Sequence, residues 1–414
     1  MASKNMAMAL AGVHPGGCLQ PYIRSFAEHL VGQGYAVLSA RNYLQAAAHL
    51  GRWMETHGIP LTDLTDDTLG CFARHRCRCA RAGRAGRRPS ASYVARTRSL
   101  IEYLRSRGAV PAVSVAEPAT HPLLVSFRDW MLRHRGLSGW TIRRYEWLVS
   151  KVLPALGDDP TVYDAARVRK ALLAQVQGLG HVYARCYVCA LRAFLRYLTV
   201  EGGCRPGLEQ AVPTIPSWRL SSLPRYLDPV DVERVVESCD LRKPCGVRDR
   251  AVLLLLARLG LRAGDIMAMT LHDLDWQAGT LRVRAKGRKE VCLPLPQDAG
   301  DAILEYLARA RPATTLTHVF LCSNAPIRPF LTSVVVSDIV RFALRRAGIA
   351  NPPSKGAHLL RHSAATAMLR KGASLDAIAT VLRHQSTDTT AHYAKIDMKL
   401  LADVTQPWPE VSPC

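Results

Sequence analysis

The chain of 414 residues carries 55 Lys or Arg against 33 Asp or Glu, a formal net charge of +22, and 48% of its residues are apolar. This length predicts two or three domains, and the apolar fraction supports folded cores. The charge indicates a polyanionic partner, with nucleic acid as the leading candidate. In the expected core, the longest apolar run, from Ala251 to Ala257, is far shorter than the roughly 18 residues that a membrane-spanning helix needs. We therefore predict no membrane association.

The amino-terminal residues and the cysteines indicate the cellular compartment. The apolar stretch from Met6 to Val13 follows Lys4, but it is too short for a secretory signal, and an arginine-rich segment follows it. The 12 cysteines are scattered rather than set in a disulfide framework. The sequence therefore predicts a cytoplasmic protein with reduced thiols.

Two segments in the amino-terminal half are similar to one another. The first contains Phe26-Ala-Glu-His-Leu, Ala40-Arg-Asn-Tyr43 and Ser99-Leu-Ile-Glu-Tyr-Leu104, and the second contains Phe127-Arg-Asp-Trp-Met, Ile142-Arg-Arg-Tyr145 and Ala193-Phe-Leu-Arg-Tyr-Leu198. Each has an apolar residue every three or four positions, which is typical of amphipathic helices. We predict an amino-terminal helical domain over residues 1–120 and a second over residues 121–212, the first being a candidate duplicate of the second.

An arginine-rich spacer distinguishes the first segment from the second. Between Cys71 and Val110 there are 11 arginines and one glutamate. The stretch from Arg81 to Pro89 has neither the acidic partners nor the apolar stripe of a packed helix. We interpret it as an arm that tracks DNA phosphates, with Arg84, Arg87 and Arg88 as contacts, rather than as a solvated loop.

Two groups of cysteines are candidates for metal or redox chemistry. Cys71, His75, Cys77 and Cys79 are of the types that bind zinc, but no second spaced pair completes a finger pattern, and arginines alternate with them. Cys186 and Cys189 lie three residues apart in a stretch of helical periodicity. We interpret both groups as buried or half-buried thiols and predict no metal site.

A stretch with three prolines and several serines, from Pro213 to Pro224, predicts a linker over residues 213–226. The remaining residues, 227–414, are expected to form one compact domain. Asp228 and Pro229 are typical of the start of a helix, as N-cap and first residue.

Within this domain, the apolar stretch from Ala251 to Leu259 predicts a helix that ends at Gly260. Asp265 lies in the first turn of the next predicted helix, where a carboxylate is favourable. Arg262 directly precedes that helix, where the macrodipole does not favour a cation. The helix macrodipole therefore does not explain why an arginine stands at this position, which indicates a different role.

The stretch from Thr280 to Leu295 predicts a hairpin of two strands with a turn at Lys286-Gly287. Its first strand alternates apolar residues with basic ones. The basic residues are candidates for DNA contacts, although an exposed hairpin that only aids solubility would have the same pattern. These candidates are Arg282, Arg284, Arg288 and Lys289. Lys286, at the tip, is placed to reach a DNA groove or a scissile phosphate.

The next predicted helix begins at His358 and ends near Gly372. The spacing of His358 and Arg361 puts the imidazole and the guanidinium on one face, one turn apart. Ser374 predicts the start of a further helix that ends at His384, and Tyr393 follows nine residues later.

Together these residues resemble the tyrosine recombinase, or phage integrase, family. Its order of Arg, Lys, His-x-x-Arg, His or Trp, and Tyr is met by Arg262, Lys286, His358, Arg361, His384 and Tyr393. The resemblance covers Leu227 to Met398, and His121 to Gly202 as the family's helical core-binding domain. Two positions depart from the family pattern: Arg383 stands where a glycine is usual, and Asp265 where a glutamate is commoner.

The resemblance implies a multidomain α+β protein, mainly α, in which a catalytic domain with a small β-hairpin or sheet follows one or more SAM-like helical core-binding domains. It implies that Tyr393 attacks a DNA phosphodiester to give a 3′-phosphotyrosyl link. Arg262, Arg361 and His384 would stabilise the phosphate, His358 would act as base, and Lys286 would protonate the departing 5′ oxygen. No cofactor and no metal are expected.

The implied partners are double-stranded DNA with paired half-sites and further recombinase subunits, either as a homo-oligomer, such as a tetrameric synapse, or with sister recombinases. The protein would be associated with the nucleoid and act in integration, excision or transposition. Two alternatives stay open: a DNA-binding regulator on the same fold without catalysis, and a type IB topoisomerase. The apolar residues after Tyr393, which include Met398, Leu400, Leu401 and Val404, would pack on their own subunit or on a neighbouring one.

Overall fold

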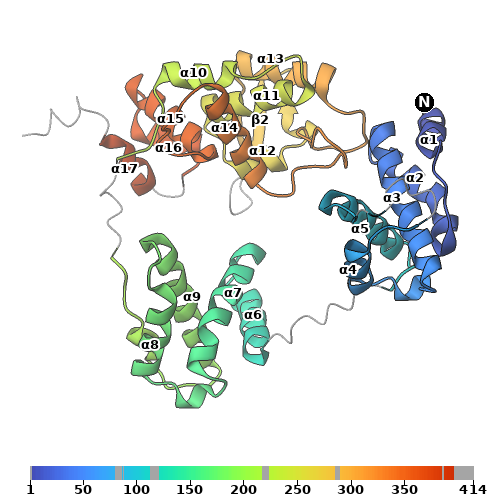
Figure 1. Cartoon of the computed structure of the whole chain (residues 1–414). Coiled ribbons are helices and arrows are strands. Elements are labelled where there is room, and N and C mark those ends of the chain that lie inside the picture. Colours follow the sequence, from blue (N-terminus) through green and yellow to red (C-terminus); the bar gives the residue numbers. More distant parts are fainter. Residues whose placement is uncertain are drawn as a thin grey trace, which may run out of the picture. The chain divides into compact units, whose positions relative to one another are not determined.

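The computed structural model describes residues 2–79, 86, 88–111, 121–216, 223–284, 290–384 and 387–395. Packing divides the chain into two units, one formed by Val113–Ser221 and the other by Met1–Ala112 with Ser222–Cys414. Three main hydrophobic cores lie along the chain, and Figure 1 labels the elements that enclose them. We propose that these cores belong to the three domains expected from the sequence, 1–120, 121–212 and 227–414.

The amino-terminal part is helical. The helix α3 packs against its neighbours and buries Leu44 and Leu50 together with Phe26, Leu100 and Leu104. Thr65 and Ser90 accept hydrogen bonds from the backbone at the starts of α4 and α5, as N-cap residues do. The elements are α1 (Ala2–Leu10), η1 (Gly17–Tyr22), α2 (Ile23–Gly32), α3 (Val37–Thr56), η2 (Leu61–Asp63), α4 (Asp66–Arg74) and α5 (Ala91–Ser106).

The unit Val113–Ser221 is also helical, with a core built around Phe127, Leu148, Leu191 and Phe194. Ser138 caps α7, and the carboxylate of Asp164 caps α8. The elements are α6 (Pro122–His134), α7 (Gly139–Leu156), η3 (Pro160–Val162), α8 (Ala165–Val176), α9 (His181–Val200) and η4 (Leu208–Ala211).

The carboxy-terminal part surrounds the helix α11, which is buried along most of its length because almost every residue from Ala251 to Leu259 is apolar. The helices α13 and α15 pack against it. The helical elements are α10 (Pro229–Glu237), α11 (Pro244–Leu259), α12 (Ala263–Ala268), η5 (Leu271–Asp273), α13 (Gln297–Glu305), the π-helical η6 (Tyr306–Ala310), α14 (Val334–Arg346), α15 (Ala357–Arg370), α16 (Leu375–Leu382) and α17 (Thr387–Ala394).

A three-stranded antiparallel sheet completes this part, with β1 (Leu274–Asp275), β2 (Thr280–Arg284) and β3 (Glu290–Pro294) in that order. Leu281 pairs with Leu293, and both are buried, whereas Arg282 and Arg284 are exposed on the opposite face. The alternation predicted for the first strand is therefore confirmed over Thr280–Arg284, and the turn predicted at Lys286-Gly287 lies outside the described residues. The mainly helical fold with a small antiparallel sheet is also confirmed. Within the described part of the chain, no helix is both long enough and apolar enough to cross a membrane.

Helix ends in this part follow the sequence signals with one difference. Gly260 ends α11 with a left-handed φ of 57°, and the Ser374 hydroxyl accepts a hydrogen bond from the Ala377 backbone, as predicted. Asp228 precedes α10, but its side chain makes no capping bond. Its carboxylate instead accepts a hydrogen bond from Arg370, because α10 and α15 pack against each other.

Candidate active site

Four elements bring the predicted catalytic residues of the carboxy-terminal part together. Arg262 directly precedes α12, Arg361 lies in α15, His384 follows α16, and Tyr393 lies in α17. The helices α15, α16 and α17 contact one another (Figure 1), and the Tyr393 side chain is buried. Lys286, Arg288 and Lys289 lie outside the described residues.

The guanidinium of Arg361 joins the ends of two helices. It donates to the carbonyl of Gly260, after α11, and to the carbonyl of Leu382, at the end of α16, the latter at 2.5 Å. Gly260 is required at this crossing, because a Cβ there would lie 2.5 Å from the Leu382 side chain. Burial, together with the positive charges of Arg262 and Arg383, lowers the pKa of Arg361 to about 10. Arg361 is therefore a buried cation whose neighbours are also cations.

Arg262 takes part in the same arrangement. Its guanidinium donates to the carbonyl of Arg383 at 2.8 Å, and its backbone N–H donates to the carboxylate of Asp265, also at 2.8 Å. Burial and the charge of Arg383 lower the pKa of Arg262. Its place before α12 is explained by this contact with the residue that follows α16, and not by the dipole of α12.

Arg383 and Asp265, the two departures from the family pattern, form one ion pair. The Arg383 guanidinium donates to the Asp265 carboxylate, and both side chains are largely buried. The backbone of Arg383 has a φ of 54°, a left-handed conformation that glycine adopts most easily. Nε and Nη1 of Arg383 are buried and have no hydrogen-bond partner among the residues that the structure describes. The guanidinium groups of Arg262, Arg361 and Arg383 therefore form a cluster with a single carboxylate, that of Asp265, among the described residues, which favours an anion beside them.

Tyr393 is only 2% exposed, and its hydroxyl lies 2.6 Å from Nδ1 of His362. Burial raises the pKa of Tyr393 to about 12, against the effect of the Arg361 charge. Burial and the neighbouring His358 lower the pKa of His362 to about 4. Both groups are thus neutral near pH 7, and the phenol donates to the imidazole.

The sequence motif ends at Arg361 and did not predict a role for His362. A signal was present, since His362 lies four residues after His358 and hence on the same helix face. His362, and not His358, makes the described contact with the phenol. The His358 ring lies 6.4 Å from the His362 ring.

His384 also lies near the phenol. Its ring is parallel to the Tyr393 ring, with a centroid distance of 6.5 Å, and its Nδ1 lies 2.8 Å from the Thr390 hydroxyl. Burial and the charges of Arg361 and Arg262 lower the pKa of His384 to about 4. Burial and the same arginines lower the pKa of His358. Burial and the nearby arginines therefore favour the neutral form of both histidines.

The lowered pKa of His362 predicts acid sensitivity. Its pKa is about 4 in the folded chain against the ordinary 6.5, so between these pH values the unfolded chain binds more protons. The stabilisation is complete above pH 6.5 and is lost as the pH falls toward 4. We expect the urea midpoint of His362→Asn to fall less steeply across this window than that of the wild type, as followed by circular dichroism. The exposed His181 provides the control His181→Asn, and a slope of His362→Asn equal to that of the wild type would contradict the prediction.

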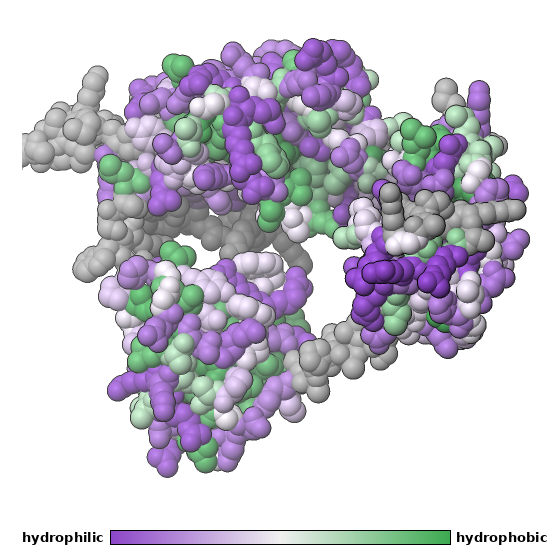
Figure 2. All heavy atoms as spheres, viewed as in Figure 1, coloured by the Kyte–Doolittle hydropathy of each residue, from purple (hydrophilic) through white to green (hydrophobic). Residues whose placement is uncertain are grey.

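Of the predicted DNA contacts, the structure describes Arg88, Arg282 and Arg284. Arg282 and Arg284 are exposed on β2, where Arg284 forms an ion pair with Glu290 at 3.5 Å. Arg88 is exposed shortly before α5, and Arg84 and Arg87 lie outside the described residues. Figure 2 shows hydrophilic side chains gathered over α4 and α5.

Comparisons with known proteins agree on one family. Residues 225–399 match the phage integrase family. A putative integrase/recombinase of Sinorhizobium fredii, y4rA, is 38% identical over 95% of this chain and 96% of its own length. The tyrosine recombinase XerD of Listeria monocytogenes is 30% identical over 68% of this chain and 96% of its own. A solved dimer of lambda integrase residues 75–356 bound to a COC′ core site has a similar fold, with a TM-score of 0.54 and 17% identity over 70% of this chain and 98% of that one.

Proposed function

Because the chain belongs to the phage integrase family of tyrosine recombinases and is a site-specific DNA recombinase, we propose that it cuts and rejoins DNA through a 3′-phosphotyrosyl intermediate on Tyr393. The observation that carries this proposal is the buried Tyr393 hydroxyl, on which the charge of Arg361 acts, together with the cluster that Arg361 forms with Arg262, Arg383 and Asp265. A phosphodiester carries negative charge, and that charge redistributes over the nonbridging oxygens during attack. The clustered guanidinium groups of Arg262, Arg361 and Arg383 would supply fixed positive charge to such a phosphate.

Arg262 and Arg361 are the proposed phosphate donors. Each uses part of its guanidinium to fix a backbone carbonyl, which leaves further N–H groups to bind the two nonbridging oxygens. A lysine has its three N–H donors on one nitrogen, so it could not reproduce the spacing of contacts that the planar guanidinium fork allows. His358 and His384 are proposed to donate further hydrogen bonds to the phosphate.

The proposed step transfers the phosphate from the DNA 5′ oxygen to the tyrosine. The Tyr393 oxygen forms a bond to phosphorus, its proton passes to Nδ1 of His362, and the bond from phosphorus to the 5′ oxygen breaks. By the resemblance, Lys286 protonates the departing oxygen. A 5′ hydroxyl from another strand then attacks the phosphotyrosine and reseals the DNA. One ester replaces another, so the cycle needs no ATP.

The test uses duplexes with a random central sequence and a nick that lets the cleaved 5′ fragment diffuse away. Wild-type protein should retain DNA in complexes that resist denaturant, and sequencing that DNA gives the target site. The trapped fragment should be joined to protein at its 3′ end. Absence of such complexes would favour the alternative of a regulator without catalysis. Relaxation of a single duplex without strand exchange between two duplexes would favour a topoisomerase.

We further propose that the protein acts on paired half-sites in a tetrameric synapse, alone or with sister recombinases, and in integration, excision or transposition at the nucleoid. The family supports this assembly. The tail with Met398, Leu400, Leu401 and Val404, which we propose to dock on a neighbouring subunit, lies outside the described residues.

The arginine-rich arm should contribute to DNA affinity by neutralising phosphates. Changing Arg84, Arg87 and Arg88 together to alanine is expected to lower the slope of log affinity against log salt by up to ~0.9 for each phosphate that the arm no longer neutralises. Fluorescence anisotropy on the captured duplex measures this slope. Arg24→Ala, which removes an exposed arginine paired with Glu28 on α2, is the control. A triple variant with the wild-type slope would show that the segment is only a solvated loop.

A further inference from the structure

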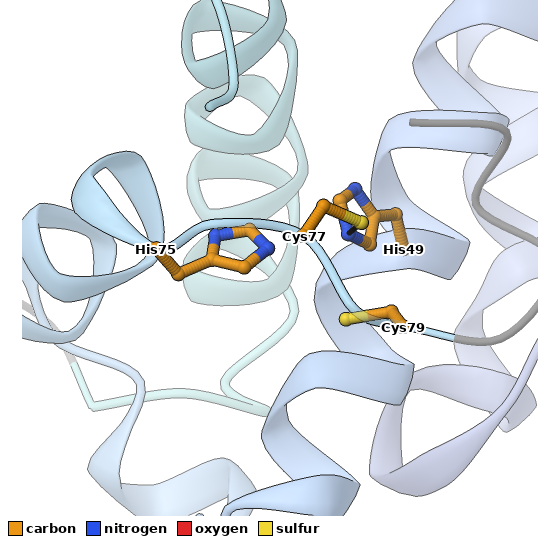
Figure 3. Close-up of side chains that lie close together, drawn as sticks. All are labelled: His49, His75, Cys77 and Cys79. Atoms are coloured by element: carbon orange, nitrogen blue, oxygen red, sulfur yellow. Dashed lines mark hydrogen bonds between the residues drawn. The ribbon is translucent and has the colours of Figure 1, made fainter. Parts of the chain in front are cut away.

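Two histidines and two cysteines meet in the amino-terminal part of the chain, apart from the residues of the active site. His49 lies in α3, His75 directly follows α4, and Cys77 and Cys79 come next in the chain (Figure 3). One ligand atom from each residue, a ring nitrogen or a sulfur, lies within 4.8 Å of all the others. We propose that these four residues bind a structural Zn²⁺ ion.

The distances suit tetrahedral zinc. Bonds of 2.0 to 2.3 Å to nitrogen and sulfur place the ligand atoms about 3.3 to 3.8 Å apart. Nε2 of His49 and Sγ of Cys77 are already 3.2 Å apart. The widest separation of 4.8 Å closes to that range with a shift of about 1 Å, which side-chain rotation supplies. Both cysteines are free thiols, so both sulfurs are available as ligands.

The hydrogen bonding of His75 indicates that its Nε2 is available as a metal ligand. Its Nδ1 faces the carbonyl of Phe72, and a carbonyl only accepts, so Nδ1 carries the proton. Its Nε2 therefore carries a lone pair, and within the described part of the chain this buried atom has no hydrogen-bond partner. Figure 3 shows the His75 ring directed toward Cys77 and Cys79. A metal ion in the cluster would satisfy this buried nitrogen.

In His49, as in His75, hydrogen bonding places the proton on Nδ1 and the lone pair on Nε2. Its Nδ1 lies 3.2 Å from the Tyr93 hydroxyl, which donates its proton to the carbonyl of Gln45 at 3.4 Å. The hydroxyl can then only accept from the Nδ1–H of His49. This leaves the lone pair of His49 on Nε2, the atom beside the Cys77 sulfur. Metal-bound histidines are oriented in this way, by donating the second ring N–H to an acceptor.

In the segment that follows α4, the proposed zinc ligands lie on one face and the arginines on the other. In an extended chain alternate residues share a face. His75, Cys77 and Cys79 are buried or half-buried, whereas Arg76 and Arg78 are exposed. The backbone N–H of Gly86 donates to the carbonyl of Cys77 at 2.8 Å, so the chain returns to the cluster after the arginines. The ion would fix this segment to α3 with its arginines facing solvent. Zn²⁺ with two thiolates is neutral and adds no charge beside them.

Metal analysis of the full chain, produced without a polyhistidine tag and freed of loose metal, tests the proposal. We expect about one zinc per wild-type chain, and a loss of it in Cys77→Ser and in Cys79→Ser. Cys71→Ser is the matched control, because Cys71 is an exposed thiol in the same region that lies outside the cluster. Wild-type protein that holds no zinc after reconstitution would overturn the proposal, as would loss of zinc in Cys71→Ser equal to that in Cys77→Ser.

Cobalt substitution of the wild-type chain gives a test that does not depend on the folding of variants. Co²⁺ in the site should show the intense visible bands of tetrahedral geometry and thiolate charge transfer. His75→Cys should keep one metal and raise the charge-transfer intensity about 1.5-fold, because three thiolates replace two. A weak octahedral spectrum, or a disulfide between Cys77 and Cys79 in freshly isolated metal-free protein, would overturn the assignment.

Discussion

Tyr393→Phe is expected to abolish covalent capture of DNA and to leave DNA affinity unchanged. The substitution removes one oxygen, while the ring keeps its packing with Ala365, Ile378 and Leu382. The missing hydrogen bond to His362 should cost about 1 kcal/mol of stability, which a folded domain tolerates. Without the oxygen no phosphotyrosine can form. Denaturing gels of protein with the captured duplex measure the loss of capture, and anisotropy measures the affinity.

Tyr306→Phe is the matched control for this substitution. Tyr306 is also a buried tyrosine of the carboxy-terminal part, and its hydroxyl accepts a hydrogen bond from the backbone N–H of Leu321. It belongs to a different hydrophobic cluster from Tyr393, so the variant should capture DNA as the wild type does. If Tyr393→Phe still captures DNA as well as the wild type, another residue is the nucleophile and the proposed function needs a different site.

Arg361→Lys is expected to lower the single-turnover rate of capture by about 100- to 1,000-fold, the effect of losing one preorganised donor to a developing charge. The lysine amine is a single point charge. It cannot bind the carbonyls of Gly260 and Leu382 together with a phosphate oxygen. The same substitution should lower the urea midpoint of unfolding, because the ends of α11 and α16 lose their common donor. Measuring the rate at saturating protein and the midpoint separately distinguishes the two effects.

Arg370→Lys is the control on the same helix. Arg370 is exposed at the end of α15, where it bonds to Asp228 and to the Tyr226 hydroxyl, and surface substitutions of this kind change stability by less than about 0.5 kcal/mol. Its capture rate should equal that of the wild type. A wild-type rate in folded Arg361→Lys would show that Arg361 serves the fold and not the phosphate.

The sequence by itself determined the features that depend on residues close together along the chain. Gly260 ends α11, because only a residue that tolerates a left-handed backbone fits there, and Ser374 caps α16. Strand alternation placed Leu281 inside and Arg282 outside. The order and spacing of the proposed catalytic residues identified the family. All of these signals are local or fixed in order, so they can be read without knowing which helices pack together.

Only the tertiary structure decided which distant side chains meet. Asp265 and Arg383 lie 118 positions apart and appeared as two unrelated departures from the family pattern, until packing of their helix ends made them one ion pair. His362 was adjacent to a motif in the sequence, but its contact with Tyr393 depends on how α15 and α17 pack.

The proposed zinc site likewise depends on contacts between distant residues that the sequence alone does not show. The sequence grouped Cys71 with His75, Cys77 and Cys79, and the expected second pair was missing. In the structure Cys71 is exposed and contacts Arg74, while His49 takes the fourth position from a helix that begins and ends well before the cysteines. A set of ligands from separate elements has no fixed spacing along the chain, because the loops between elements vary in length. Its members become neighbours only when hydrophobic burial packs α3 against the segment that follows α4.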